Sequence, residues 1–167
     1  MQPIATQIHN SLLKAKKTIA VAESCTGGLL SSLLTQNSGS AQYFILGFVT
    51  YSNKSKENIL SIPAKLIASK GAVSKETAQN MALSVRKIAQ ADYGVSITGI
   101  AGPTGGTLNK PVGTVFIAIS GKSKTICKQF NFSGNRASIR KQSATTALKL
   151  LKQFIYKEAL NESIYSY

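Results

Sequence analysis

The chain contains very few of the residues that most enzymes use to move protons. Among its 167 residues there is one histidine, His9, and there are six carboxylates: Glu23, Glu57, Glu76, Asp92, Glu158 and Glu162. His9 falls in a helix expected at the start of the chain and has no carboxylate near it in sequence, so we interpret it as a solvated side chain. If the protein is an enzyme, its proton-transfer group is expected to be a lysine.

The same scarcity argues against several classes of site. One histidine, no paired carboxylates and no Cys-x-x-Cys spacing leave no set of metal ligands, and we predict neither a metal nor another cofactor. Two distant cysteines, Cys25 and Cys127, form no framework of disulfides, which fits a reducing compartment. No apolar run approaches the roughly 20 residues that span a bilayer, and the first residues lack the order of charge and then apolar block seen in secretory signals. We therefore expect a soluble, cytoplasmic protein without a membrane partner.

Negative charge is also scarce, which leaves a net charge of +14. The basic residues are nevertheless scattered: Lys14, Lys16 and Lys17 form the densest group, and no known nucleic-acid motif accompanies them. This argues against a nucleic-acid partner, and salt-sensitive DNA binding is kept only as a third hypothesis for the function. An anionic small substrate would also be attracted by such a field.

Helical and strand-like patterns alternate along the chain. Short apolar or β-branched runs predict strands at Thr18–Ala22, Phe44–Tyr51, Tyr93–Thr98, Val112–Ser120 and Lys124–Phe132, the last two as a hairpin. Helices are predicted over residues 2–16, from Leu29 to near Asn37, from a cap at Asn53 to Leu60, from Pro63, after Ser74, and from Arg136 to about Tyr156, with a frayed end at Asn161–Tyr167. This order predicts one α/β domain over 1–167, a three-layer α/β/α sandwich whose mixed, partly parallel sheet has about five strands.

One stretch combines a possible nucleophile with accessible backbone amides. Ala22-Glu23-Ser24-Cys25-Thr26-Gly27-Gly28 lies where the first predicted strand ends and a helix begins, the usual place for ligands in open α/β sheets. Because glycines leave the first helical N–H groups bare, those amides can meet a phosphate or a developing oxyanion. The candidate substrate-binding residues here are Cys25, Thr26, Gly27 and Gly28. A plain helix cap followed by glycines that permit close packing is the alternative interpretation.

A candidate base follows the second predicted strand, in Thr50-Tyr51-Ser52-Asn53-Lys54-Ser55-Lys56. A serine needs a base within hydrogen-bond reach, and Lys56 qualifies only if its pKa falls from about 10.4. Burial, the positive end of the helix macrodipole, Lys54 and the overall charge all lower that pKa. Tyr51 could share the proton or orient the amine. The competing interpretation is a solvated basic helix start beside a core tyrosine.

Two further groups are predicted at the same edge of the sheet. The loop Gly99–Gly106 follows the third strand but matches neither the phosphate loop nor the dinucleotide fingerprint; within it, Gly102 and Gly105 are candidate substrate-binding residues. Arg136 and Arg140 are four positions apart near a helix N-terminus, a spacing that suits a phosphate. Two solvated arginines fit this pattern equally well.

Five ordered blocks make the chain similar to a known protein family. They are Ala-Glu-Ser-Cys-Thr-Gly-Gly at 22–28, Gly-Phe-Val-Thr-Tyr-Ser-Asn at 47–53, Gly-Ala-Val-Ser at 71–74, Ser-Ile-Thr-Gly-Ile-Ala-Gly-Pro-Thr-Gly-Gly at 96–106 and Lys-Pro-Val-Gly-Thr-Val at 110–115. With these blocks, nearly all of residues 5–155 closely resembles the CinA C-terminal-domain family, the nicotinamide-nucleotide amidohydrolases, also described as competence/damage-inducible protein A.

The resemblance implies an activity and a site. The activity is hydrolysis of the carboxamide of nicotinamide mononucleotide to nicotinic acid mononucleotide and ammonia, without metal or cofactor. The family's serine nucleophile falls on Ser24, its lysine base on Lys56 and its tyrosine on Tyr51. Relatives usually form homodimers, and many carry an additional N-terminal molybdopterin-binding-like domain whose pyrophosphatase activity is not transferred to this chain.

On this basis we expect neutral Lys56 to take the Ser24 proton while Tyr51 helps relay it to departing ammonia. Amides of the corner Thr26–Gly28 would hold the oxyanion. Two alternatives stay open: Cys25 could be the nucleophile, or the protein could be a non-catalytic nucleotide- or partner-binding module associated with competence or DNA damage.

Overall fold

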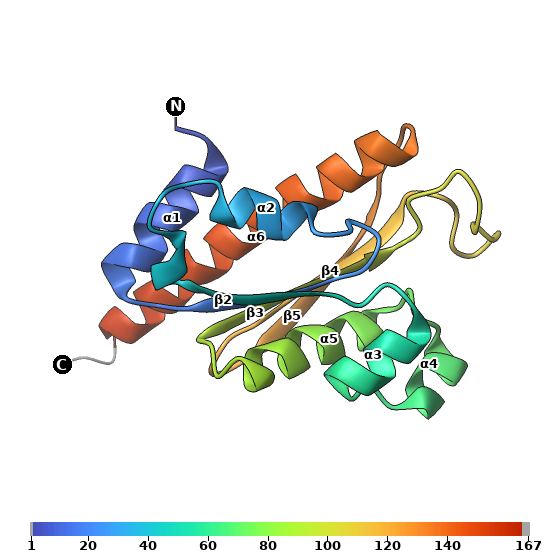
Figure 1. The fold of residues 1–167 in the computed structure, drawn as a ribbon, viewed down its shortest axis with the longest axis horizontal. Coiled ribbons are helices and arrows are strands. Elements are labelled where there is room, and N and C mark those ends of the chain that lie inside the picture. Colours follow the sequence, from blue (N-terminus) through green and yellow to red (C-terminus); the bar gives the residue numbers. More distant parts are fainter. Residues whose placement is uncertain (1, 165–167) are drawn as a thin grey trace.

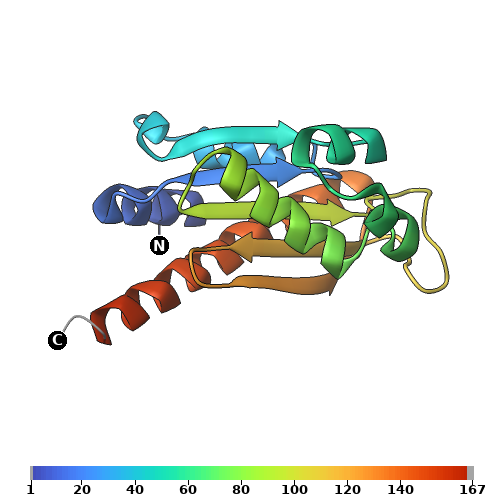
Figure 2. The same cartoon turned by 90° about the horizontal axis from the view of Figure 1, so that it is seen from below.

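The computed structural model describes the backbone of residues 2–164 and the side chains of residues 2–160. Its described part contains one mixed sheet in the order β2-β1-β3-β4-β5. The strands are β1 (Ile19–Glu23), β2 (Phe44–Val49), β3 (Tyr93–Gly99), β4 (Thr114–Ser120) and β5 (Thr125–Asn131). β1 runs parallel to both β2 and β3, whereas β4 is antiparallel to β3 and to β5 (Figure 2). The predicted five-stranded, partly parallel sheet with a C-terminal hairpin is confirmed.

Helices cover both faces of this sheet, as Figure 1 shows. One face carries α1 (Ile4–Ala15), α2 (Leu29–Thr35) and the long α6 (Arg136–Ile164); the other carries α3 (Asn53–Leu60), α4 (Ala64–Lys70) and α5 (Lys75–Ile88). A short 3-10 helix, η1 (Ser40–Gln42), leads into β2. Apolar side chains from the sheet pack against both helical layers, so the three-layer α/β/α sandwich is confirmed.

The central strand β1 explains where the site can form. All five of its residues are buried, as expected for a short, continuously apolar strand that lies between two parallel neighbours. The strand begins and ends one residue later than the sequence predicts, so it closes on Glu23 and not on Ala22. A carboxylate therefore occupies the last position of a buried strand, immediately before Ser24.

Some predicted boundaries are wrong. Ser52 caps α3, with its Oγ accepting from the Ser55 amide at 3.0 Å, and Asn53 is the first helical residue. The sequence could not separate the two positions, because serine and asparagine cap helices about equally well. Helix α6 continues past Tyr156 as far as Ile164, so the end predicted to fray is helical up to that residue, and 165–167 lie outside the described part.

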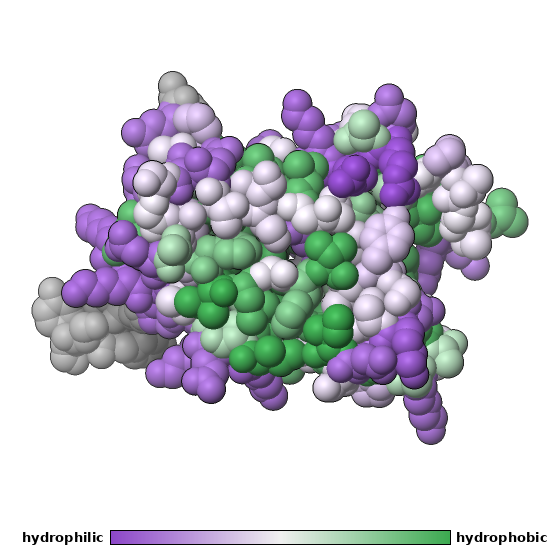
Figure 3. Space-filling model, in the orientation of Figure 1, coloured by the Kyte–Doolittle hydropathy of each residue, from purple (hydrophilic) through white to green (hydrophobic). Residues whose placement is uncertain are grey.

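The free edge of the sheet at β2 is apolar. None of the six residues Phe44–Val49 is charged, and Ile45 is 47% exposed with Val49 similarly open to solvent. Figure 3 shows a broad hydrophobic patch over this part of the molecule. Edge strands that are uncharged and exposed are surfaces that tend to pair with another chain. Within the described residues, no helix has both the length and the apolar character needed to cross a membrane.

Candidate active site

The predicted site residues gather where the parallel strands end. Ser24 follows β1, Thr50 and Tyr51 follow β2, and the loop Gly99–Gly106 follows β3, so all three segments meet at the edge formed by the carboxyl ends of these strands (Figure 2). They surround a cleft with a volume of about 260 Å³. Its lining comprises Ser24, Cys25, Tyr51, Asn53, Lys56, Ala72, Val73, Thr98, Gly99, Ile100, Ala101, Gly102, Thr104, Gly105 and Arg136.

Lys56 reaches into this cleft from the first turns of α3 and is almost completely buried, with 1% of its surface exposed. Its Nζ lies 2.8 Å from the Thr50 carbonyl oxygen, 3.3 Å from the Tyr51 carbonyl oxygen and 3.2 Å from Ser24 Oγ. The predicted meeting of the hydroxyl and the amine is therefore present. The interpretation of Lys56 as a solvated residue at a helix start is wrong.

Burial lowers the pKa of Lys56, because an ammonium in this position loses its hydration, while the nearby Cys25 acts weakly in the opposite direction. Among the described residues, no carboxylate forms an ion pair with Lys56. A neutral amine has two N–H donors and one lone pair. When Lys56 is deprotonated, the two carbonyl oxygens, which can only accept, take the two N–H groups and leave the lone pair for the Ser24 hydroxyl.

Cys25 also lines the cleft, but burial raises the pKa of its thiol to about 11. The thiolate, which is the reactive form, is therefore scarce near neutral pH. Its side chain has no hydrogen bond to Lys56 among the described contacts, whereas Ser24 does. The environment thus favours the hydroxyl over the thiol as the nucleophile.

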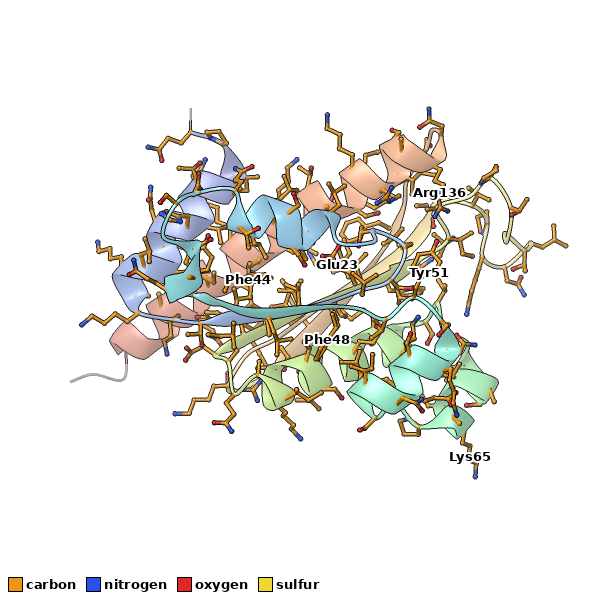
Figure 4. All side chains as sticks on the ribbon, in the orientation of Figure 1. Glu23, Phe44, Phe48, Tyr51, Lys65 and Arg136 are labelled. Atoms are coloured by element: carbon orange, nitrogen blue, oxygen red, sulfur yellow. The ribbon has the colours of Figure 1, made fainter. Side chains whose placement is uncertain are left out.

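Tyr51 contacts Lys56 through its backbone and not through its phenol. The side chain is 56% exposed, and its hydroxyl accepts a hydrogen bond from Arg136 Nη2 at 2.7 Å. Arg136 Nη1 donates to the Gly102 carbonyl at 3.0 Å, which joins the Gly99–Gly106 loop to the tyrosine. Figure 4 shows the two side chains at the same end of the molecule. Tyr51, Arg136, Gly102 and Gly105 are therefore at the cleft as predicted, but the tyrosine sits at its mouth.

The corner amides behave differently from the sequence expectation. The Gly27 amide donates to the Ser24 carbonyl at 3.0 Å, and the Gly28 amide donates to Glu23 Oε2 at 3.1 Å. Neither glycine lines the cleft, so they are not placed to bind a substrate phosphate or an oxyanion. The anion at the N-terminus of α2 is the protein's own Glu23 carboxylate, which the sequence analysis did not assign to any role.

Thr26 and Arg140 also lie outside the cleft lining. Arg140 donates from Nε and Nη2 to the Thr26 carbonyl oxygen, at 3.2 and 2.6 Å. Arg140 thus holds the backbone of the corner and does not line the cleft, whereas Arg136 does, and the role of Arg140 in binding a substrate phosphate stays a prediction. The Thr26 hydroxyl is buried and has no partner among the described residues.

Sequence reasoning missed some of the lining. Asn53, treated as a helix cap, faces the cleft, and Thr98 and Thr104 contribute further hydroxyls. Asn53 ends one of the five sequence blocks, and this was the available signal. No acidic side chain lines the cleft, while Lys56 and Arg136 do, so its electrostatic character suits an anionic ligand. No cluster of metal-ligating side chains occurs among the described residues.

Four larger hollows lie elsewhere, with volumes of about 300, 440, 480 and 490 Å³. They are formed along the β5 edge, between α1 and α6, and along α6 beside Phe132. Every lysine in their linings is exposed, so none of them offers a buried amine beside a hydroxyl. The smaller cleft is the better candidate because of its chemistry.

Comparison with known proteins agrees with this picture. The family model described as CinA C-terminal domain matches residues 1–155. A putative competence-damage inducible protein of Thermoanaerobacter pseudethanolicus is 49% identical over 86% of this chain, and a CinA-like protein of Endomicrobium trichonymphae is 50% identical over 90%. Each of these alignments covers 35% of the relative, so the chain spans about a third of their length.

Solved structures show the same fold over most of the chain. The competence/damage inducible protein CihA from Agrobacterium tumefaciens has a TM-score of 0.88 at 35% identity, covering 90% of this chain and 92% of that one. A competence-damaged protein (CinA) superfamily protein from Klebsiella pneumoniae has a TM-score of 0.89 at 30% identity, covering 92% and 96%. The chain belongs to the CinA C-terminal domain family.

Proposed function

We propose that this protein hydrolyses the carboxamide of nicotinamide mononucleotide to nicotinic acid mononucleotide and ammonia. The observation that carries the proposal is the position of the Lys56 amine, which is held by two backbone carbonyls and directed at Ser24 Oγ. A buried lysine whose pKa is lowered in this way can act as the base for a serine nucleophile once it has lost its proton. The substrate itself is inferred from the family resemblance.

In the first step, Ser24 Oγ attacks the carboxamide carbon and its proton passes to Lys56. The amide nitrogen then leaves as ammonia after it takes that proton back, which leaves an acyl group on Ser24. A water molecule attacks the acyl carbon while Lys56 again accepts a proton, and the serine is regenerated as the carboxylic acid departs. No redox group or metal is needed to balance these steps.

The oxyanion needs different donors from those the sequence suggested, because the amides of Gly27 and Gly28 already have acceptors. Among the described residues, the amides of Cys25 and Thr26 have no acceptor oxygen. Of these two residues only Cys25 lines the cleft, so we assign its amide, which directly follows the nucleophile, to the oxyanion; a single such donor is typically worth about 3 kcal/mol of barrier.

Arg136 and Tyr51 are assigned to substrate binding at the mouth of the cleft. Arg136 uses Nη1 and Nη2 on Gly102 and Tyr51, and it is the one arginine in the lining, so it provides the positive charge for the phosphate of the substrate. The Tyr51 oxygen accepts from Arg136, which leaves its own proton available to donate towards the cleft. Tyr51 therefore orients the substrate or the leaving group.

The test is ammonia release from nicotinamide mononucleotide by the purified protein. Ser24→Ala and Lys56→Met should each abolish turnover. Lys54→Met is the matched control, since Lys54 is exposed on the same helix and should leave turnover unchanged. A protein that binds the nucleotide without releasing ammonia would instead be the binding module associated with competence, and would not require an amine at position 56.

A further inference from the structure

Glu23 is a fully buried carboxylate to which the proposed chemistry gives no part. It ends β1, shows no solvent exposure and directly precedes Ser24. Acidic side chains are almost never buried in this way unless they are paired. No basic side chain pairs with it: the one salt bridge among the described side chains joins Lys17 and Asp92.

The carboxylate is satisfied entirely by the start of α2. Oε2 accepts from the amides of Gly28 and Leu30 at 3.1 and 3.0 Å, and Oε1 accepts from the amide and the hydroxyl of Ser31 at 2.8 and 2.7 Å. These amides have no partner inside the helix and form its positive end. Glu23 therefore occupies the position where a bound anion would otherwise sit, and Figure 4 places it between β1 and α2.

The glycines of the corner make this contact possible. Gly27 and Gly28 have φ angles of +59° and +94°, so the chain turns back after Ser24 through conformations that other residues adopt rarely. The turn aims the Gly28 amide at Glu23. On the other side of the turn, Arg140 holds the Thr26 carbonyl with two N–H groups. The segment with the nucleophile is thus fixed at both of its ends.

The backbone of Glu23 also reaches the base. Its carbonyl accepts from the Thr50 amide at 2.8 Å, and the Thr50 carbonyl accepts from Lys56 Nζ at the same distance. Ser24 is one bond further along the chain, where its amide donates to the Ile97 carbonyl at 3.0 Å. One residue therefore connects the segment that carries the hydroxyl to the one that holds the amine.

We propose that Glu23 is a positioning residue: its carboxylate anchors the N-terminus of α2 and thereby fixes Ser24 Oγ within reach of the Lys56 amine. This inference rests on the proposed function, because it assigns Glu23 a role towards the same serine. It also explains why the N-terminus of α2 is not open to a substrate anion. A displacement of about 1 Å at such a site can cost 100-fold in rate.

The test measures the reactivity of Ser24 without the natural substrate. Di-isopropyl fluorophosphate forms a phosphorus–oxygen bond to an activated serine while fluoride leaves with the electrons of the phosphorus–fluorine bond, and the serine proton passes to Lys56. The rate of modification at Ser24 is followed by mass spectrometry of the intact protein and its peptides. Glu23→Gln preserves the size of the side chain but turns an N–H group towards the amides of α2, and should slow labelling by about 100-fold.

Asp92→Asn is the matched control for a merely structural effect. Asp92 also accepts from an amide and a hydroxyl, those of Thr18 at the opposite end of β1, at 2.8 and 3.0 Å. The same change of carboxylate to amide there should lower stability without changing the labelling rate. For Glu23→Gln, turnover of nicotinamide mononucleotide should show a loss in kcat with KM changed less than about threefold, because Glu23 does not line the cleft.

A milder pair keeps the test decisive if Glu23→Gln does not fold. Ser31→Ala removes one donor to Glu23, whereas Ser32→Ala alters an exposed neighbour without such a contact. Slower labelling of Ser31→Ala alone is the expected result. Equal rates in wild type, Glu23→Gln and Ser31→Ala would overturn the positioning role and leave the proposed function intact, whereas no labelling of wild-type Ser24 would overturn both.

Discussion

Replacing Lys56 by methionine should change how the stability of this protein depends on pH. Burial lowers the pKa of Lys56 in the folded state, and in the unfolded chain this pKa returns to about 10.4. Between the two values the unfolded state holds one more proton at this site than the folded state. The free energy of unfolding therefore rises with pH in that window, because stability increases wherever the unfolded state binds more protons.

The size of the effect follows from one proton. For a single site the free energy of unfolding gains up to about 1.4 kcal/mol per pH unit across the window. Methionine cannot titrate, so Lys56→Met lacks this slope. The difference in stability between wild type and Lys56→Met should thus shift in favour of wild type as pH rises, and should level off above the pKa of the unfolded chain.

Urea denaturation of both proteins at several values between about pH 7 and 10 measures this difference, and titrating groups that do not interact with Lys56 cancel in it. Lys54→Met should keep the pH dependence of wild type. The rate of ammonia release should also rise with pH. Its midpoint should lie at the pKa of Lys56 in the folded protein, which is the pH where the stability difference begins to grow, because the rate and the stability difference both depend on the protonation of this amine. Parallel stability curves for wild type and Lys56→Met would refute a depressed pKa and, with it, the role of Lys56 as base.

Three further outcomes are expected. Cys25→Ala should retain most ammonia release, since burial holds the thiol protonated, with its pKa raised to about 11; loss of turnover with normal folding would instead favour the thiol as nucleophile. Gly94→Ala should destabilise the fold by about 1–3 kcal/mol in urea denaturation, because the new methyl would overlap the Ala82 carbonyl where α5 crosses β3. We also propose that two copies pair along the uncharged β2 edge, so Ile45→Lys should give monomers in sedimentation; Ile88→Lys, at a site with the same 47% exposure, should not.

The meeting of Ser24 and Lys56 was predictable because it depends on topology. Each follows a short strand predicted to be buried or rich in β-branched and aromatic residues, and the ends of parallel strands lie at one edge of a sheet. The sequence also contained the reason for the depressed pKa, since a lysine that joins such a site loses hydration. Burial is the dominant cause of the lowered pKa, and Lys54, on which the prediction also relied, is not among its causes.

The hydrogen-bond partners of the corner Thr26–Gly28 were not predictable from the sequence, because they depend on backbone angles and helix packing. Gly27 and Gly28 signalled bare amides, but only their positive φ angles show that the α2 amides turn towards Glu23 and away from the cleft. Arg140 reaches Thr26 because α6 packs against α2, a contact between residues 114 positions apart. In a sequence, Arg136 and Arg140 are equivalent; in the fold one lines the cleft and the other holds the backbone.

The arrangement of Glu23 also bears on the state of the base. A carboxylate one residue from the nucleophile is well placed in sequence to pair with Lys56, and such a pair would raise the pKa of the amine and keep it protonated. The four hydrogen bonds from α2 direct this carboxylate to the other side of the corner instead. Lys56 is thereby left with two neutral carbonyls and a hydroxyl as partners, and no carboxylate pairs with it to offset the lowering of its pKa by burial. The same contacts that fix the nucleophile therefore also keep the Glu23 carboxylate from pairing with the base.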